Sequence, residues 1–133
     1  MHKVFLGGTC NESSWRDIIM PRLKIDYFNP VVDDWTPDCQ AEEERQKNEE
    51  CDIHLYVITP KMTGVFSIAE LVESAINKGD NCVFCYLQED GDLTFNEAQT
   101  KSLNAVRDLV SQYGAVCTDS LSEVVNILNK YYE

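Results

Sequence analysis

Short apolar runs alternate with helical patterns along the chain, and this alternation restricts the fold more than any other feature of the sequence. The run DIHLYVI, residues 52–58, is apolar enough to be a central strand that is covered on both faces. Parallel strands need long crossover connections, which helices supply with right-handed geometry. The sequence therefore predicts an α/β fold with one doubly wound, five-stranded parallel sheet of the flavodoxin or Rossmann-like type, in the strand order 2-1-3-4-5.

The individual elements follow from the same patterns and from the positions of glycine and proline. The predicted strands are residues 3–6, 24–28, 52–58, 81–87 and 115–117. The predicted helices are residues 13–23, 38–50, a helix that begins at about Ser67, and residues 96–113 and 121–131. No repeat or linker interrupts this order, so residues 1–133 are expected to form a single domain.

The chain is acidic, with 23 Asp and Glu residues against 11 Lys and Arg residues and a formal net charge of −12. This charge would repel a nucleic-acid backbone or an anionic membrane surface, although amide groups at a helix N-terminus could still hold a small phosphate. No apolar run approaches the length of about 20 residues that a membrane span needs. Gly7 and Gly8 interrupt the first apolar segment too early for a secretory signal, and we expect a cytoplasmic protein.

The six cysteines are scattered, and Cys82 and Cys85 lie within an apolar run. Residues three apart in a strand point to opposite faces, so this pair is unsuited to a redox or metal site. We therefore expect buried free thiols rather than a disulfide scaffold. His54 lies inside a predicted buried strand and is expected to be a core histidine with satisfied hydrogen bonds. No metal-binding spacing is present, and neither a metal nor another cofactor is expected.

In a doubly wound sheet, ligands bind beyond the carboxyl ends of the strands, where the winding direction switches. The residues that this rule selects are Gly7, Gly8 and Thr9 after the first strand, Asn29, Asp33 and Trp35 after the second, Thr59 to Glu70 after the third, and Gln88 after the fourth. Two adjacent glycines allow a ligand to approach the backbone closely, so Gly8→Val is expected to weaken ligand binding more than stability. Without a ligand the glycines would form only a tight turn, and the loop after the second strand could equally be solvated.

The stretch SIAE, residues 67–70, has two interpretations. It fits the S-x-x-E capping box, in which the Ser67 hydroxyl and the Glu70 carboxylate bind free amides of the first helical turn. Alternatively, Glu70 faces the crevice from the helix after a central strand, where a carboxylate can attack an electrophilic carbon. Spacing alone favours the cap. The acidic stretch before the central strand, which includes Arg45 and Lys47, has the composition of a solvent-exposed helix.

Four stretches, KVFLGGT, YFNPVVDDW, CDIHLYVITP and FSIAELVESA, resemble the nucleoside 2-deoxyribosyltransferase-like family. The resemblance extends from about Lys3 to Lys78. It implies that Glu70 attacks C1′ of a (deoxy)nucleoside or nucleotide, expels the base and forms a covalent glycosyl ester. A second base or water would then take the 2-deoxyribosyl group, with overall retention at C1′.

The resemblance also implies roles for neighbouring residues. A family aspartate that lies eight residues before the aspartate opening the central strand corresponds to Glu44 here, with an expected role in holding the sugar or assisting the leaving base. Gly64 stands where well-known members carry an acid, which leaves Asp33 or a partner subunit to protonate the base. Ser67 belongs to the motif of the nucleophile, and the glycines with Thr9 match the loop that contacts the sugar or a 5′ phosphate.

The family further implies a homodimer or larger homo-oligomer that acts on a small-molecule nucleoside or nucleotide. A rival interpretation is a non-catalytic module of the same fold that senses a nucleotide without turning it over, because the fold alone does not decide between the two. Release of the base from deoxynucleosides would separate them.

Overall fold

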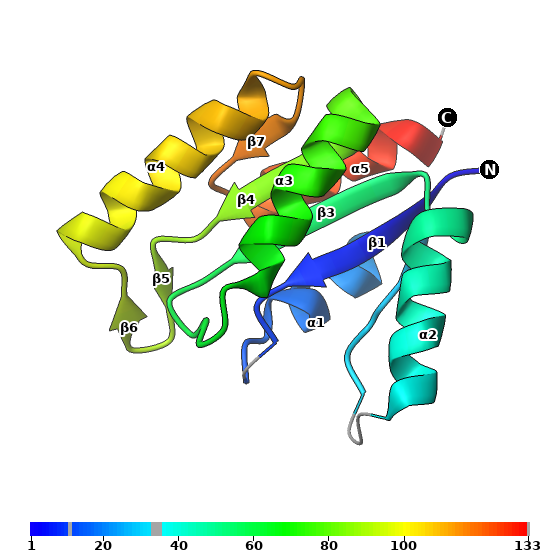
Figure 1. Ribbon diagram of the computed structural model, residues 1–133, viewed down its shortest axis with the longest axis horizontal. Helices are drawn as coiled ribbons and strands as arrows, with labels where there is room; N and C mark the ends of the chain where they lie inside the picture. Colours follow the sequence, from blue (N-terminus) through cyan, green and yellow to red (C-terminus); the bar gives the residue numbers. More distant parts are fainter. Residues whose placement is uncertain (11, 33–35, 133) are drawn as a thin grey trace.

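Five parallel strands form the centre of the protein in a computed structural model that describes residues 1–10, 12–32 and 36–132 (Figure 1). The strands are β1 (Lys3–Gly8), β2 (Asp26–Phe28), β3 (Ile53–Ile58), β4 (Cys82–Tyr86) and β7 (Val116–Thr118). Their order in the sheet is β2-β1-β3-β4-β7, and every neighbouring pair is parallel. The predicted fold class and strand order are therefore confirmed.

The helices lie between the strands, with shifts from the predicted ends. They are α1 (Trp15–Ile19), α2 (Pro37–Arg45), α3 (Phe66–Lys78), α4 (Glu97–Ser111) and α5 (Leu121–Asn129). Four are extended by the 3-10 turns η1 (Met20–Arg22), η3 (Gly79–Asn81) and η4 (Lys130–Tyr132) and by the π-helical turn η2 (Gln46–Glu50). The first helix is shorter than predicted because Pro21 has no amide hydrogen to donate, and η1 replaces the last turn. None of the described helices is both long and apolar enough to cross a membrane.

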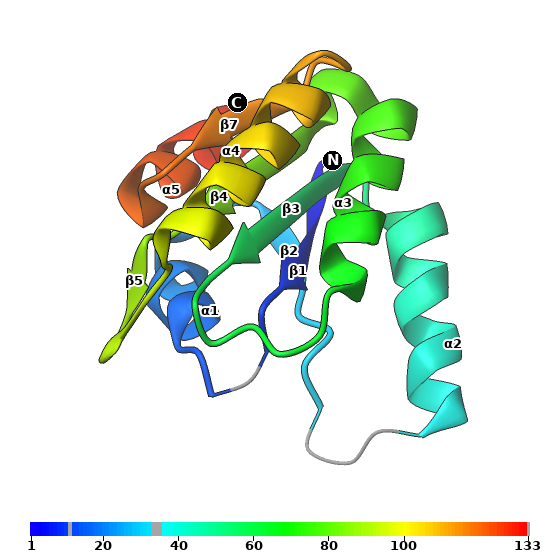
Figure 2. The ribbon, with the colours of Figure 1, turned by 60° about the vertical axis from the view of Figure 1, so that its left-hand side comes forward.

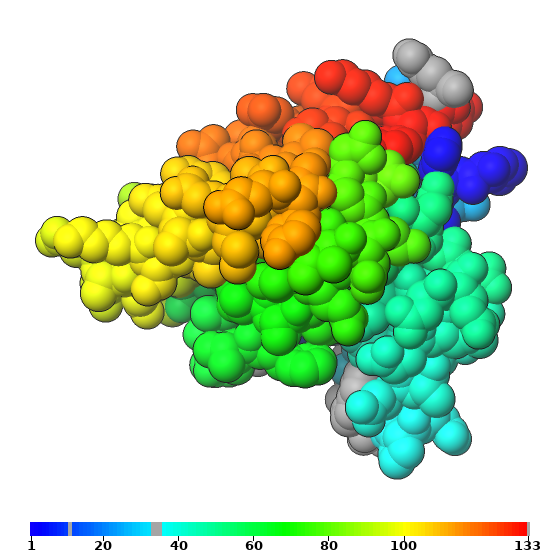
Figure 3. Space-filling view, turned by 45° about the horizontal axis from the view of Figure 1, so that its top comes forward, coloured from blue at the N-terminus to red at the C-terminus, as the bar shows by residue number. Residues whose placement is uncertain are grey.

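Helices α3 and α4 lie on one side of the sheet and α1 and α5 on the other (Figure 2), and a layer of hydrophobic core fills each side. Ile53, Leu55 and Val57 of β3 pack with side chains of α1 and α5 on one face. Tyr56 and Ile58 pack with side chains of α3 and α4 on the other face. All residues of β3 are buried, as the apolar run predicts for a central strand. On the surface, α3 and α4 lie side by side, and α2 projects beside them (Figure 3).

The six cysteines are free thiols, and Cys82 and Cys85 lie in opposite core layers, as predicted. Burial raises the pKa of both these thiols to about 12, so they are protonated and unreactive at neutral pH. Cys51 is also buried, whereas Cys10 is exposed and the remaining two are partly exposed. The expectation of buried thiols is thus correct for three of the six.

A two-stranded hairpin, β5 (Glu89–Asp90) and β6 (Leu93–Thr94), follows β4 and is not indicated by the sequence patterns. Each of its strands has two residues, which is too short for an alternating pattern to show. Gly91 supplies a positive φ of 62° in the connecting turn.

The strand β1 continues through both glycines, whereas the sequence predicts that it ends at Leu6. Gly7 pairs with Tyr56 and Gly8 with Val57 of β3. Gly8 has a φ of 117°, and a Cβ atom there would lie 2.0 Å from the backbone oxygen of Val57. The sheet itself therefore requires Gly8, and a side chain there would cost stability, which the expectation for Gly8→Val leaves out.

We predict that Gly8→Ala lowers the free energy of unfolding by about 2–3 kcal/mol, because it adds left-handed strain and a backbone clash. Gly64→Ala is the matched control, since a Cβ atom at Gly64 meets nothing within 4 Å. The control should change the free energy of unfolding by less than about 0.5 kcal/mol. Urea denaturation of both variants measures the difference, and equal effects would show that β1 tolerates a side chain at Gly8.

Candidate active site

A cleft of about 270 Å³ opens between α2 and α3 at the carboxyl end of β1. This is the edge of the sheet at which the topology predicts a ligand. Its walls come from β1, α1, the loop after β2, α2 and α3, through Phe5, Gly7, Gly8, Cys10, Arg16, Pro30, Val31, Val32, Glu43, Ser67 and Glu70. The cleft thus combines an apolar side with two carboxyl groups that lie on different helices.

A second hollow of about 310 Å³ adjoins the cleft on the side of the loop after β3. The two share Gly8, Cys10, Ser67 and Glu70, so the Glu70 side chain borders both. Thr9, Gly64 and the start of α3 line only the second hollow. Ser67 precedes Glu70 by three residues, which puts both side chains on the same face of α3.

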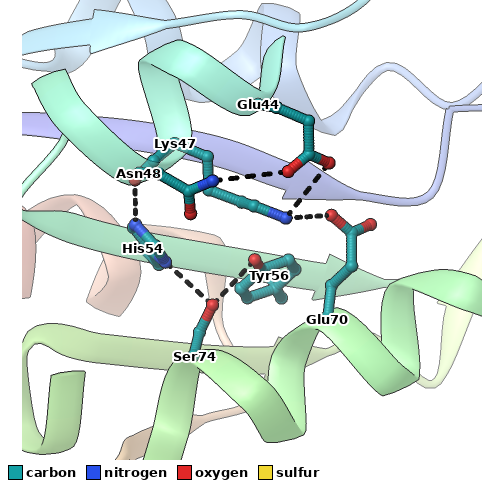
Figure 4. Close-up of polar contacts among 7 residues, drawn as sticks. All are labelled: Glu44, Lys47, Asn48, His54, Tyr56, Glu70 and Ser74. Carbon is teal, nitrogen blue, oxygen red and sulfur yellow. Dashed lines mark hydrogen bonds and ion pairs between the residues drawn. The ribbon is translucent and has the colours of Figure 1, made fainter. Parts of the chain in front are cut away.

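The Glu70 carboxylate is held by a buried lysine (Figure 4). Its Oε2 atom lies 2.9 Å from Lys47 Nζ, and the side chains of Glu70 and Lys47 are only 13% and 5% exposed. The other carboxylate oxygen, Oε1, makes no hydrogen bond within the part of the chain that the structure describes. Glu70 therefore has one oxygen fixed by a cation and one available to a ligand.

The capping box predicted for residues 67–70 does not form. α3 begins at Phe66 with Val65 as its N-cap residue, and no side chain caps this end. Ser67 lies inside the first turn, and the Glu70 carboxylate binds Lys47 instead of a free amide. The interpretation of Glu70 as a helix-capping residue is therefore wrong.

Lys47 reaches Glu70 from the π-helical turn that ends α2. Burial of the ammonium group would lower its pKa, but the hydrogen bond and charge of Glu70 and the charges of Glu44 and Glu73 outweigh burial and raise it. Lys47 is therefore a permanent cation at neutral pH. The sequence gives it no special signal, because it lies among the glutamates of a polar helix.

Glu43 and Glu44 differ in their relation to the cleft. Glu43 lines it, and burial, with a further contribution from the charge of Glu70, raises the pKa of the Glu43 carboxyl group. Glu44 has a half-exposed side chain, with Oε1 at 3.8 Å from Lys47 Nζ and Oε2 at 3.4 Å from Asn48 Nδ2. Successive residues of an α-helix point about 100° apart, so the side chains of Glu43 and Glu44 point in different directions, and Glu43 is the one that faces the cleft.

The family model described as nucleoside 2-deoxyribosyltransferase like matches residues 1–89 of the 133, which includes the cleft residues described above. The chain belongs to this family. No curated protein and no solved structure gave a significant match. The resemblance of the four sequence stretches to the nucleoside 2-deoxyribosyltransferase-like family is thus confirmed, and this family suggests a small-molecule nucleoside as ligand.

In this nucleoside 2-deoxyribosyltransferase-like chain, hydrogen bonds fix the end of β1 and the residue that follows it, Thr9. Thr9 is buried, its amide donates to the Val57 oxygen at 2.9 Å, and its hydroxyl oxygen accepts from the Thr59 amide at 3.0 Å. Arg16 donates to the backbone oxygens of Leu6 at 3.0 Å and Thr9 at 2.7 Å. The hydroxyl of Thr9 therefore joins the end of β1 to the end of β3, and the backbone at Gly8 and Thr9 is held in place beside the two hollows.

The loop after β2 reaches the cleft through Pro30, Val31 and Val32 rather than through Asn29. Asn29 Oδ1 accepts a hydrogen bond from the Val31 amide at 3.1 Å and so shapes this loop. The predicted ligand residues Asp33 and Trp35 lie outside the described residues.

Gln88, the predicted residue after the fourth strand, is exposed and donates to the backbone oxygen of Phe95 at 2.9 Å. Within residues 1–10, 12–32 and 36–132, no three His, Cys, Asp or Glu side chains form a group that could hold a metal ion.

We predict strong thermodynamic coupling between Lys47 and Glu70. Lys47→Met and Glu70→Gln should each destabilise the protein by leaving a partner without its opposite charge, and the double variant should lose less than the sum. The coupling free energy from urea denaturation should be about 1–3 kcal/mol. The exposed pair of Arg45 and Glu42 is the control and should show much weaker coupling. Additive losses at Lys47 and Glu70 would contradict a buried ion pair.

Proposed function

We propose that the protein is an enzyme that cleaves the N-glycosidic bond of a (deoxy)nucleoside or nucleotide through a covalent glycosyl ester of Glu70. It then transfers the 2-deoxyribosyl group to another base or to water. The observation that supports this most directly is the Glu70 carboxylate on the cleft wall, with one oxygen bound to Lys47 at 2.9 Å. A carboxylate that is charged, oriented and partly desolvated suits nucleophilic attack at C1′.

The first step forms a bond between Glu70 Oε1 and C1′ while the bond from C1′ to the base nitrogen breaks. The electron pair of the broken bond moves to the base, which takes a proton. In the second step a nitrogen of another base, or the oxygen of water, attacks C1′ and the ester bond breaks. Its electron pair returns to Glu70, and the attacking group gives up a proton. Lys47 stabilises the carboxylate before the first step and as it leaves in the second.

Glu43 is the proposed acid that protonates the departing base and the base that accepts the proton in the second step. It shares the cleft with Glu70 and has a raised pKa, so its protonated form persists to higher pH than that of an ordinary glutamate. This assignment fills the role for which the sequence offers Asp33 or a partner subunit. Glu44, which the resemblance implies as a catalytic residue, would act through its charge on Lys47.

The cleft also supports an orientation for the substrate. The apolar loop Pro30–Val32 lies on the same cleft as Glu43 and offers contact area to a base. Ser67 and the backbone at Gly8 border both hollows beside Glu70, where the sugar must lie for attack at C1′. The second hollow, beside Gly64, is then left for the 5′ side of the sugar.

We predict that a 2-deoxy-2-fluoro nucleoside converts the wild-type protein into a stable ester on Glu70. Fluorine destabilises the positive charge that develops at C1′ in both steps, so the ester accumulates. Mass spectrometry of the intact protein should show one adduct, and digestion should place it on the peptide that contains residues 67–73. Glu70→Gln should form no adduct and lose at least about a thousandfold in kcat on natural substrates.

Discharge of the same adduct separates the two reactions. A second base should release the sugar faster than water does if the protein is a transferase, and equal release would identify a hydrolase. An adduct on Glu43, Glu44 or Asp33 would contradict the assignment of the nucleophile. Tight reversible nucleotide binding without an adduct or base release would favour the nucleotide-sensing module instead.

We predict that Glu43→Gln lowers kcat on ordinary deoxynucleosides by about a hundredfold, because the base must then leave without a proton. An N7-methylated purine deoxynucleoside carries a base that is already cationic, so its kcat should fall by much less. For ordinary substrates the wild-type kcat should decrease as the pH rises through the raised pKa of Glu43, and Glu43→Gln should remove that decrease. The same substrate-dependent loss in Glu44→Gln, and not in Glu43→Gln, would move the role to Glu44.

A further inference from the structure

Buried hydrogen bonds connect β3 to both helices of the cleft from behind (Figure 4). His54 Nε2 lies 2.8 Å from the backbone oxygen of Lys47, and His54 Nδ1 lies 2.8 Å from Ser74 Oγ. The Tyr56 hydroxyl lies 2.9 Å from the same Ser74 oxygen. His54 and Ser74 are 4% and 3% exposed. The prediction that His54 is a core histidine with satisfied hydrogen bonds is confirmed, and one of its partners is the main chain of Lys47.

The π-helical turn explains why the Lys47 oxygen needs this partner. The amide of Cys51 donates to the Gln46 oxygen at 2.8 Å, and the amide of Asp52 donates to the Lys3 oxygen at 3.1 Å. The amides that could continue the helix to Lys47 are therefore used elsewhere. A buried carbonyl without a hydrogen bond is costly, and His54 supplies the missing donor.

The direction of each hydrogen bond follows from the Lys47 oxygen. A carbonyl oxygen can only accept, so Nε2 of His54 carries the hydrogen. Burial, which is the largest cause, lowers the pKa of His54 to about 4, so the ring is neutral at pH 7 and Nδ1 is an acceptor. Ser74 then donates to Nδ1 and accepts from Tyr56. Each of these groups has one defined role, which fixes the orientation of the imidazole ring.

Ser74 follows Glu70 by four residues on α3, so the two side chains lie on the same face of that helix. The turn η2 and the helix α3 are therefore joined twice. One link is the ion pair of Lys47 and Glu70, and the other is His54 between the Lys47 oxygen and Ser74. Only the ion pair depends on the charge of Glu70, and that charge disappears when an ester forms.

We propose that His54 is a positioning residue for the Lys47–Glu70 pair: it keeps Lys47 in place beside Glu70 when the ion pair is lost in the glycosyl ester. The proposal rests on the proposed function of Glu70 as the nucleophile. Lys47 must meet the carboxylate that leaves in the second step, and a lysine that had moved away would need time and free energy to return. The contribution of His54 is therefore greatest in the breakdown of the ester.

Two substitutions of His54 separate its two hydrogen bonds. In His54→Gln the amide nitrogen can take the place of Nε2 and donate to the Lys47 oxygen, while the bond to Ser74 is lost. In His54→Asn the amide oxygen can take the place of Nδ1 and accept from Ser74, while the bond to Lys47 is lost. Both variants keep a polar side chain in the buried strand. Val124→Ala, a cavity variant in the opposite core layer, is the control for loss of stability alone.

We predict that His54→Asn lowers kcat by about tenfold or more and lowers KM with it, so that kcat/KM for the donor nucleoside stays within about threefold of wild type, because the slowed step follows ester formation. Discharge of the 2-deoxy-2-fluoro ester by a second base should slow by a similar factor in this variant. His54→Gln should stay within about threefold of wild type in both rates, and Val124→Ala should change neither. Equal rates in the two His54 variants, or an equal loss in Val124→Ala, would overturn the proposal.

A second measurement does not depend on turnover. The ammonium group of Lys47 is buried and hydrogen-bonded, so it should give a ¹H–¹⁵N resonance in NMR spectra that is absent from Lys47→Met. In a Glu70→Gln background, which removes the charge of Glu70 as the ester does, the resonance should persist with His54→Gln and broaden or vanish with His54→Asn. A wild-type protein without turnover or adduct would refute the proposed function, and this pair of spectra would still test the position of Lys47. The same resonance in both His54 variants, or in neither, would overturn the role of His54.

Discussion

All residues of β3 are buried, and a buried strand can hold a polar side chain only if every polar atom finds a partner inside the protein. His54 and Tyr56 both point toward the layer of α3, where Ser74 provides the common partner. The face of β3 toward α1 and α5 is apolar instead. The core layer on the α1 and α5 face of β3 and the core layer on the α3 face therefore have different roles. One supplies packing alone, and the other also carries the hydrogen bonds that reach Lys47 behind the cleft.

The charge of Lys47 imposes a second constraint, because a lysine that is 5% exposed needs compensating carboxylates. Glu70 is the nearest at 2.9 Å, and Glu44 lies at 3.8 Å on the outer side. A cation with two partners keeps one of them when the other is neutralised. In the proposed glycosyl ester Glu70 is uncharged, and Glu44 would then remain as the counter-ion of Lys47. Glu44 can thus affect the reaction through electrostatics while its own side chain stays half exposed outside the cleft.

The sequence predicts the sheet well because each central strand is a distinct apolar run and crossover rules leave few strand orders. It fails where local and tertiary preferences compete. Ser67 and Glu70 have the spacing of a capping box, but the N-cap is Val65, two residues before Ser67, and Lys47 offers Glu70 a charged partner. In contrast, the capping box of Asn96 and Gln99 forms at the start of α4. The position of Glu70 in the crevice could be predicted from topology, whereas its partner could not.

Sequence patterns do not single out Lys47 and Glu43, because the side of α2 and η2 that faces the rest of the protein is polar. The less exposed residues there are Thr36, Cys39, Glu43, Gln46 and Lys47, which follow helical spacing. A search for an apolar stripe finds none in this segment, and a solvated helix is the natural interpretation. Yet polar side chains that are shielded from water need hydrogen bonds or ion pairs with other polar groups or with a ligand. Glu43 and Lys47, four residues apart, therefore lie on the side of the helix that faces Glu70. The polar stripe that a hydrophobicity pattern misses is the feature that brings a cation and a second carboxyl group close to Glu70.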